Sequence, residues 1–245
     1  ELAHLLAAAH IDVVLVARSR DKLAALAVDL VRAHGVQAHV IAQDLALPSA
    51  PEAIVQDLAA RGLPVDILIN NAGFGTYGLF AGTPAEEESR LIQVNITALT
   101  MLTKLLLPPM LQRRHGRILN VASTAAFQPG PLMAVYYASK AYVLSFSEGI
   151  GNELKGTGVT VTALCPGPTR TGFATAAGMT NSNLFNAPGV MDAAPVAEAG
   201  YRGCMKGKAV VIPGMLNKVL VWVIAFSPRW MVTPISRRLQ ERKVE

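Results

Sequence analysis

The stretch VDILINNAG, residues 65–73, decides the fold class of this chain. Its apolar residues follow one another without polar alternation, and turn-forming residues come directly after them. A short continuous run of this kind indicates a strand that is buried on both faces. Such strands are typical of a parallel sheet that is covered by helices.

Similar runs recur along the chain and alternate with segments of helical periodicity. Further strands are expected at 11–17, 36–42, 116–123, 158–167 and 208–214, and helices at 19–35, 50–61, 84–113 and 134–155. Ser19 is placed as the N-cap of the helix at 19–35, and Gly35 is placed as its C-terminal stop. This alternation predicts an α/β fold with a doubly wound, Rossmann-like parallel sheet in a single domain.

The composition agrees with a globular protein, since 51% of the residues are hydrophobic and 16% are charged. The two cysteines, Cys165 and Cys204, have no neighbouring ligands, so no metal site is expected and both are predicted to be buried thiols. The apolar run 219–226 is too short to span a bilayer, which needs about 20 residues. No signal peptide is visible in the opening ELAHLLAAAH, and we therefore predict a cytoplasmic location.

Positive charge is concentrated at the C-terminal end, although the formal charge of the whole chain is +5. The basic residues from 206 onward are Lys206, Lys208, Lys218, Arg229, Arg237, Arg238, Arg242 and Lys243, and the acids are Glu241 and Glu245. A basic segment can face nucleic acid, anionic lipid or a phosphorylated substrate. No interleaved basic and aromatic surface of the nucleic-acid-binding kind is present, so no nucleic-acid partner is expected.

Small or polar residues follow nearly every predicted strand. In open α/β sheets, ligands bind outside the carboxyl ends of the strands. The residues at those ends are Arg18, Asp44, Asn71, Ala72, Gly73, Ser123, Pro166 and Gly167. Turn chemistry explains any one of them, but it explains poorly why Ser123 is followed by a helix that carries tyrosines and a lysine.

Tyr136 and Tyr137 precede Lys140 by four and three residues, so both can lie beside it on a helix. A lysine ammonium near a phenol favours the phenolate and lowers the phenol pKa. A serine hydroxyl nearby can hold the oxygen of a carbonyl or alcohol substrate. Such a trio suits hydride transfer to or from a nicotinamide, with the tyrosine as acid or base. Helix geometry alone does not choose between the two tyrosines.

Several motifs in order resemble those of the short-chain dehydrogenase/reductase family, and the resemblance runs from residue 1 to about 214. They are NNAG at 70–73, QVNITA at 93–98, NVASTAA at 120–126, YYASK at 136–140 and CPGPTRT at 165–171. The resemblance implies that Ser123, Tyr136, Lys140 and Asn95 are catalytic, because Tyr136 satisfies the YxxxK pattern and Tyr137 does not. It therefore implies an oxidoreductase that interconverts a ketone and a secondary alcohol.

The resemblance also implies a cofactor and the residues that bind it. Family members that bind NAD usually carry an acid after the second family strand, whereas this chain reads ARSR at 17–20. Arg18 can pair with a 2′-phosphate, so NADP is favoured. The other expected cofactor contacts are Asp44, Asn71, Ala72, Gly73, Tyr136, Lys140, Pro166, Gly167, Thr169 and Thr171. A solvated charge at a helix entry is the alternative interpretation of Arg18.

Family members begin with a strand and a TGxxxGxG loop, whose glycines approach the cofactor pyrophosphate. Residues 1–10 look like the helix after that loop, so we expect the first strand to be missing here. In the family that strand lies between those at 11–17 and 65–70, which would then lose a partner or pair with each other. We expect this chain alone to bind NADP weakly or not at all, and tight NADPH binding would overturn that.

Two other functions stay open at this point. One is a non-catalytic protein with an NADP-type fold that binds a partner and is inactive because it lacks the glycine-rich loop. The other is a nucleotide-sugar epimerase, which is disfavoured because the chain has no large C-terminal substrate domain. The full set of Ser123, Tyr136, Lys140 and Asn95 favours the oxidoreductase.

Two segments bear on the substrate and on partners. Residues 168–192 are rich in Gly, Thr, Asn and Pro and predict a lid or binding loop. Its Phe173, Met179, Leu184 and Phe185 either line an apolar pocket for a lipophilic ketone or pack on the core. Residues 215–245 are predicted to form an apolar and basic helical extension beyond a catalytic domain of residues 1–214. A cap over the cleft or a protein contact is favoured there over a membrane surface, and we expect a homo-oligomer.

Overall fold

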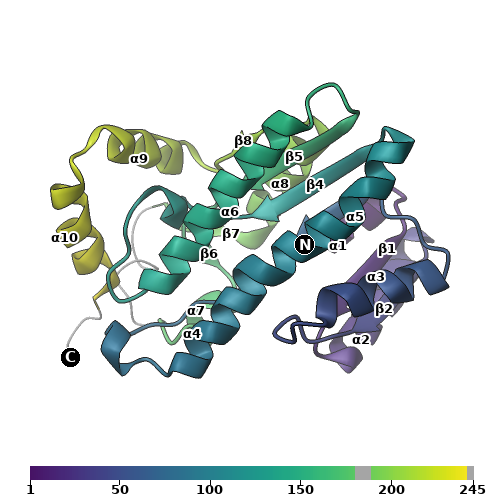
Figure 1. Cartoon of the computed structure of the whole chain (residues 1–245), viewed down its shortest axis with the longest axis horizontal. Coiled ribbons are helices and arrows are strands. Elements are labelled where there is room, and N and C mark those ends of the chain that lie inside the picture. The colour runs from purple at the N-terminus through teal and green to yellow at the C-terminus, as the bar shows by residue number, and fades with distance from the viewer. Residues whose placement is uncertain (180–188, 242–245) are drawn as a thin grey trace.

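A computed structural model describes residues 1–179 and 189–241 of the chain. The longer parallel strands form two separate sheets that are covered by helices, as Figure 1 shows, and two short strands form a third sheet. In the smaller sheet β1 (Val13–Ala17) pairs with β2 (Ala38–Ala42). The larger sheet has the order β3 (Ile67–Asn70), β4 (Gly116–Val121), β5 (Val159–Leu164) and β8 (Val210–Val211). The α/β class and the parallel strands are therefore confirmed.

The helices follow the strands in the predicted order. They are α1 (Leu2–Ala8), α2 (Arg20–His34), α3 (Ala50–Ala60), α4 (Ala85–Ile92), α5 (Leu99–Arg113), α6 (Ala134–Glu153), α7 (Phe173–Ala176), α8 (Ala193–Met205), α9 (Met215–Phe226) and α10 (Arg229–Gln240). Gly35 ends α2 at φ +69°, and its N–H bonds to the carbonyl of Val31. A left-handed residue at this position favours glycine, which confirms the predicted stop.

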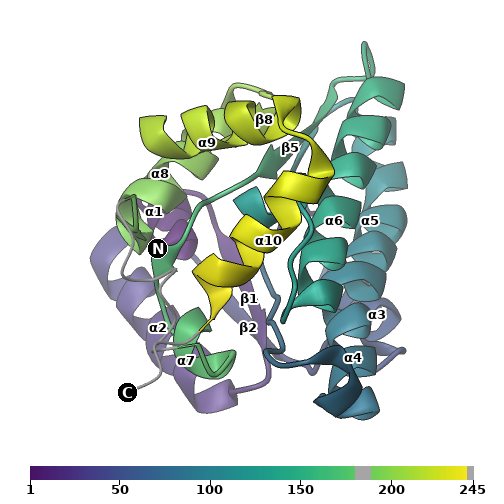
Figure 2. The same cartoon turned by 90° about the vertical axis from the view of Figure 1, so that its left-hand side faces the viewer.

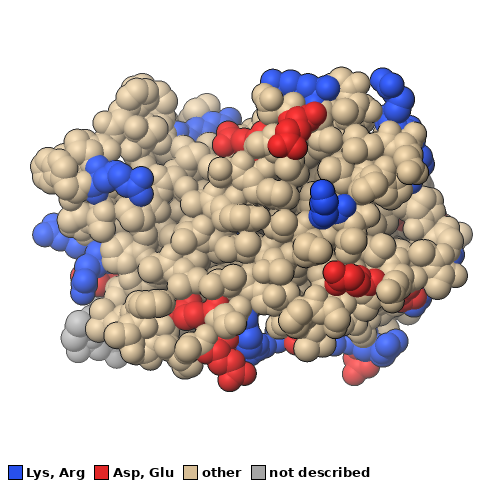
Figure 3. Space-filling model, in the orientation of Figure 1, with Lys and Arg blue, Asp and Glu red and all other residues tan. Residues whose placement is uncertain are grey.

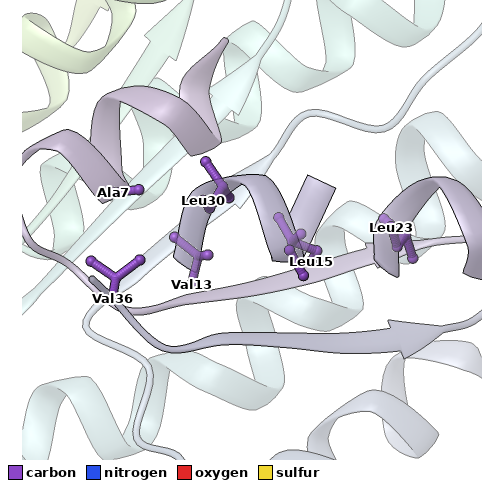
Figure 4. Packing of buried hydrophobic residues seen from close by; sticks show 7 residues of the cluster. Ala7, Val13, Leu15, Leu23, Leu30 and Val36 are labelled. Carbon is purple, nitrogen blue, oxygen red and sulfur yellow. The ribbon is translucent and has the colours of Figure 1, made fainter. Parts of the chain in front are cut away.

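Helices cover both faces of the smaller sheet. Ala7 of α1 and Leu23 and Leu30 of α2 pack on Val13 and Leu15 of β1 (Figure 4). The other face of β1 and β2 packs against α3 and α5. Burial on both faces explains why these strands read as continuous apolar runs.

The expected helix at 84–113 is a single continuous element with a π-helical turn, η2 (Gln93–Ala98), between α4 and α5. By length and composition alone, residues 85–113 could cross a membrane. However, Leu91, Leu99, Leu106 and Met110 are buried in contact with the rest of the protein. We therefore interpret it as a core helix.

The predicted loop at 168–192 contains short regular elements in its described part. β6 (Thr169–Arg170) pairs in parallel with β7 (Met191–Asp192), and α7 follows β6. The side chains of Arg170 and Asp192 form an exposed ion pair across this small sheet. Leu184 and Phe185, which the sequence suggested as pocket residues, lie outside the described residues.

A buried chain of amides joins the sheet to its helices. Asn70 donates to Thr103 Oγ1 at 3.1 Å and to Asn120 Oδ1 at 2.8 Å, and Asn120 donates to Ser147 Oγ at 2.9 Å. Asn120 and Ser147 are almost fully buried. The NNAG motif thus supports the central sheet through its first asparagine.

Replacing Asn120 with alanine is expected to lower the free energy of unfolding by about 1–3 kcal/mol, because Asn70 and Ser147 each lose a buried partner. Urea unfolding of the variant checks this. Asn152→Ala, at an exposed position near the end of α6, is the matched control and should change stability by less than about 0.5 kcal/mol. Equal stability of the two variants would show that the amide chain is not a major support.

Candidate active site

A cavity of about 1290 Å³ lies at the carboxyl edge of the larger sheet and extends between β1 and β3. Its walls include residues that follow β3, β4 and β5, which is the edge of the sheet where the sequence predicts the site. The cavity contacts both β1 and β3, and within the described part of the chain these two strands do not pair with each other. Of the two arrangements that the sequence left open, direct pairing of β1 with β3 is therefore not observed in the described residues.

Ser123, Tyr136 and Lys140 meet at this cavity. Ser123 follows β4 and precedes the short helix η3 (Thr124–Phe127), while Tyr136 and Lys140 lie on the facing side of α6. The Tyr136 hydroxyl and the Ser123 side chain form a hydrogen bond. Lys140 Nζ lies 5.8 Å from the centre of the Tyr136 ring and donates to the Val121 carbonyl at 2.7 Å. The structure thus brings together the expected trio.

Burial sets the proton affinities of this trio. Desolvation raises the pKa of the Tyr136 phenol, and its hydrogen bond with Ser123 offsets only part of the rise. The same cause lowers the pKa of Lys140 to about 8. This differs from the expected lowering of the phenol pKa by Lys140, because burial disfavours the charged forms of both groups.

Asn95 lies behind the trio in the π-helical turn, a kind of element that is frequent at functional sites. Its amide accepts from the Phe74 N–H at 3.1 Å and donates to the Phe74 carbonyl and to Ser139 Oγ. A Cβ atom at Gly73 would lie 3.1 Å from Asn95 Oδ1 and 3.4 Å from Lys140 Nζ. The loop after β3 therefore passes close to both groups, and a side chain at residue 73 would require Asn95 to shift by a few tenths of an ångström.

The CPGPTRT segment forms another wall of the cavity through Pro166, Gly167, Thr169 and Thr171. The Thr169 hydroxyl donates to the Gly167 carbonyl at 2.9 Å. A Cβ atom at Gly167 would lie only 2.4 Å from Asn217 Oδ1, so the turn fits tightly against α9. Asn71, Ala72 and Gly73 line the same cavity, as expected for cofactor contacts.

Arg18 and Asp44 lie apart from the other predicted cofactor-binding residues, which line the cavity. They follow β1 and β2, but neither lines the cavity. The Arg18 side chain is exposed, and Asp44 accepts from the Ala46 N–H at 3.0 Å. The neighbouring strands place both at one end of the smaller sheet.

Tyr137 lines the same cavity, with its ring 6.0 Å from that of Tyr136, and its hydroxyl contacts the C-terminal extension. Its hydroxyl bonds with Ser236 of α10, and its pKa is raised to about 12, mainly by burial. Its ring fits against Gly130, where a Cβ atom would overlap it at 2.1 Å. Tyr77 donates to the Gln240 carbonyl at 2.9 Å, so α10 covers this side of the site. The two tyrosines therefore have different partners, and α10 packs beside this part of the site.

The described apolar residues of the 168–192 segment lie against the trio. Phe173 packs on the Tyr136 ring with 5.1 Å between ring centres, and Met179 is fully buried in the same cluster. Both also line the cavity. The two interpretations of these residues, pocket lining and core packing, therefore both hold for Phe173 and Met179.

Sequence reasoning missed Asn217 and Ser139. Asn217 is buried, donates to the Pro213 carbonyl at 2.9 Å and holds the Gly167 turn. Ser139 links Asn95 to the Tyr136 carbonyl. A lone asparagine inside the apolar run at 215–226 was the available signal for Asn217. No signal in the sequence pointed to Ser139, which directly precedes Lys140.

The residues that line the cavity fit a nicotinamide cofactor. Two glycines, Gly73 and Gly167, keep backbone close to buried side chains at the sheet edge, and between them lies the cavity that contains the trio. A cavity at this edge of a parallel α/β sheet is where dinucleotide cofactors bind in Rossmann-type folds, and the residues present fit such a cofactor.

Comparison with known proteins gives the family. The model of the short chain dehydrogenase family matches residues 1–182. The ketoacyl reductase HetN of Nostoc is 33% identical, with 100% of this chain and 89% of that protein covered. A very-long-chain 3-oxoacyl-CoA reductase of Aspergillus clavatus is 37% identical, and the match covers 66% of this chain but only 47% of that relative. A solved short-chain dehydrogenase from Sphingobium yanoikuyae in complex with NADPH has a TM-score of 0.81 at 33% identity, with 93% and 91% of the two chains covered.

The chain therefore belongs to the short-chain dehydrogenase/reductase family, and it is an oxidoreductase enzyme with a Rossmann-like fold. A nicotinamide cofactor is the rule for this class.

Proposed function

We propose that the protein reduces a lipophilic ketone to a secondary alcohol with NADPH, with Tyr136 as the proton donor. The observation that carries the proposal is the hydrogen bond between Tyr136 and Ser123 beside Lys140, at the carboxyl edge of the sheet. A non-catalytic role does not explain why the buried Tyr136 and Lys140 converge with the half-buried Ser123 on a cavity. The test is consumption of NADPH by the natural gene product in the presence of long-chain 3-oxoacyl thioesters. Absence of consumption with every ketone tested would contradict it.

The chemistry follows from the state of each side chain. The bound cofactor supplies the hydride that adds to the carbonyl carbon. The Ser123 hydroxyl donates to the carbonyl oxygen and holds it near the phenol. Because burial raises the pKa of Tyr136, the phenol keeps its proton near neutral pH and can give it to the oxygen as negative charge develops. The carbonyl thus gains one hydride and one proton.

Lys140 stabilises the tyrosine after it has lost its proton. An ammonium near the ring favours the phenolate and can return a proton to it. Asn95 positions this region, since it fixes the Phe74 backbone and Ser139 around the lysine. We therefore assign Lys140 a catalytic role and Asn95 a positioning role.

The rate of reduction is expected to fall as pH rises through about 8, because the pKa of Lys140 is lowered to about 8 and the charged form is lost above it. A pH profile of kcat/KM measures this. In Lys140→Arg the guanidinium stays charged, so any remaining activity should persist to higher pH. A fall at the same pH in both proteins would assign the titration to another group.

We propose a preference for NADPH because Arg18 follows β1 and no acid occupies the ARSR segment. The guanidinium is exposed at the end of the strand and free to meet a 2′-phosphate. The NADPH-bound Sphingobium structure supports the assignment.

Arg18→Asp is expected to weaken NADPH binding by roughly 10- to 100-fold and to leave NADH binding nearly unchanged, because a charge-assisted hydrogen bond contributes about 1.5–3 kcal/mol. Titration with both cofactors in the natural gene product checks it. Lys22→Asp, which makes the same charge change at an exposed position in the first turn of α2, is the control. Equal loss in the two variants would show a general charge effect rather than phosphate recognition.

We further propose that a strand and a glycine-rich loop complete the cofactor site between β1 and β3. The support is that residues of both strands face the cavity while each strand has a partner on its other side only, within the described chain. The test is an NADPH titration of two proteins: the 245-residue chain, and the same chain extended at its N-terminus by the residues that the gene encodes upstream. Equally tight NADPH binding by both proteins would contradict this proposal.

The substrate is proposed to be apolar apart from its carbonyl group. Met133, Phe173 and Met179 pack around Tyr136 and line the cavity. The Nostoc and Aspergillus relatives are named for oxoacyl substrates, which supports a fatty oxoacyl thioester as the substrate class.

A further inference from the structure

The outer side of α9 is apolar and exposed. Met215, Val219, Trp222 and Phe226 recur at helical spacing, and each is between 49% and 74% exposed. The rings of Trp222 and Phe226 lie 5.0 Å apart in this stripe. Water-facing aromatic residues at neighbouring positions are unusual for a soluble helix, whose outer side is ordinarily polar.

The stripe continues onto α10. Trp230 is 76% exposed and Ile235 is 55% exposed. Both helices lie at one end of the molecule, at the left in Figure 1 and toward the viewer in Figure 2. In Figure 3 the part over these helices is mostly uncharged, with a few basic groups. We call this surface the α9–α10 apolar face, and its main residues are Met215, Val219, Trp222, Phe226, Trp230 and Ile235.

Positive charge surrounds this face, and residues 215–240 contain no aspartate or glutamate. The exposed basic residues of the two helices are Lys218, Arg229, Arg237 and Arg238. Arg237 pairs with Glu241 just after α10, so the neighbourhood keeps a net charge of +3 (four basic residues less one acid). Apolar aromatic groups flanked by basic residues match the surface of an anionic bilayer.

A second copy of the chain is a poorer partner for this face. In a two-fold contact the same patch meets itself, so the basic residues of one copy would face those of the other. Juxtaposed like charges disfavour such a contact. Charge complementarity thus favours an anionic surface over self-association.

The opposite side of α10 faces the active site. Ser236 bonds with Tyr137, and the Gln240 carbonyl accepts from Tyr77. The helix is thus fixed between the exposed face and the residues beside Tyr136. A bilayer in contact with the face would lie next to the covered side of the site.

We propose that the α9–α10 apolar face binds the surface of anionic membranes, with both helices lying in the plane of the interface. α9 has 12 residues, which is too short to span the hydrocarbon core. Trp222 of α9 and Trp230 of α10 would sit at the level of the headgroups, and the nearby lysine and arginines would contact lipid phosphates. This proposal stands apart from the proposed function, because its test does not depend on turnover.

Tryptophan emission gives a direct test, because Trp222 and Trp230 are the only tryptophans of the chain. Vesicles of equal parts phosphatidylcholine and phosphatidylserine should shift the emission to shorter wavelength and carry the protein upward in a flotation gradient. Vesicles of phosphatidylcholine alone should bind much less, and added salt should weaken binding to the anionic vesicles. Absence of both the shift and flotation would overturn the proposal.

Variants assign the binding to this face. Trp222→Ala with Phe226→Ala should reduce flotation roughly tenfold or more, because the apolar contact is removed. Arg229→Gln with Arg238→Gln should reduce binding to anionic vesicles about fivefold for each arginine. Val28→Ala, at a 64% exposed position on α2, should bind like the original protein. Undiminished flotation of the aromatic variant would contradict the assignment. The assignment would also be contradicted if the original protein were a dimer without lipid and the aromatic variant alone were a monomer, because the face would then be a dimer contact.

Discussion

Replacing Tyr136 with phenylalanine is expected to lower kcat for ketone reduction by about 10²–10⁴-fold, the usual contribution of a general acid. The phenol is buried, bonded to Ser123 and close to Lys140, so it is the proton donor that the cavity holds in place. Phenylalanine keeps the ring that packs on Phe173. Folding and NADPH binding should therefore change little, and the loss should appear in kcat.

Tyr137→Phe is the matched control. It removes the hydroxyl that bonds with Ser236 of α10 and leaves the trio intact. Its activity should stay within a few-fold of the original, with stability lowered by about 1 kcal/mol for one lost hydrogen bond. Steady-state kinetics of both variants decide between the tyrosines. Activity in Tyr136→Phe together with inactivity in Tyr137→Phe would reverse the assignment.

Replacing Gly167 with valine is expected to cost the largest amount of stability among the changes at the site. A Cβ atom there would lie 2.4–2.6 Å from three atoms of the Asn217 amide. Overpacking of this kind costs about 1–3 kcal/mol, and displacing Asn217 from the Pro213 carbonyl adds about 1 kcal/mol. The turn also lines the cavity, so activity should fall with stability. Thermal unfolding and NADPH oxidation measure the two effects.

A second substitution tests the cause. Asn217→Ala removes the amide that blocks the new side chain, so Gly167→Val with Asn217→Ala should be more stable than Gly167→Val alone. Coupling of this sign is expected for residues in direct contact. Simple addition of the two single losses would show that the clash is not what destabilises the turn.

Most of the architecture follows from the pattern of the sequence. The strands at β1, β2, β4 and β5 and the long helices lie within a few residues of the expected positions, because buried strands and helical stripes have distinct periods. The π-helical turn at Asn95 was not predicted. Its register depends on bonds to Phe74 and Ser139, which come from distant segments.

The division of the longer strands into two sheets depends on which distant strands pair, and the local sequence pattern does not show this. Continuous apolar runs show that β1 and β3 are buried, but they do not show which strand lies beside each. The expected absence of a first family strand stays a prediction. The family match begins at residue 1 and does not test it.

The candidate trio could be named from the sequence, but its electrostatics could not. Spacing placed Tyr136 and Tyr137 equally close to Lys140, and only the family pattern chose between them. The structure adds that burial raises the pKa of Tyr136 and lowers that of Lys140. Desolvation depends on the whole surrounding packing, including Phe173 and Met179 from a segment with weak periodicity. The catalytic roles themselves stay proposals.

The most direct test of the account follows the hydride. The natural gene product is incubated with NADPH that carries deuterium at the transferable position and with a long-chain 3-oxoacyl thioester, and the product is analysed by mass spectrometry. The account predicts a secondary alcohol with deuterium on the former carbonyl carbon, and no such product from Tyr136→Phe over the same time. An unlabelled alcohol, or NADPH consumption without reduction of the ketone, would contradict it.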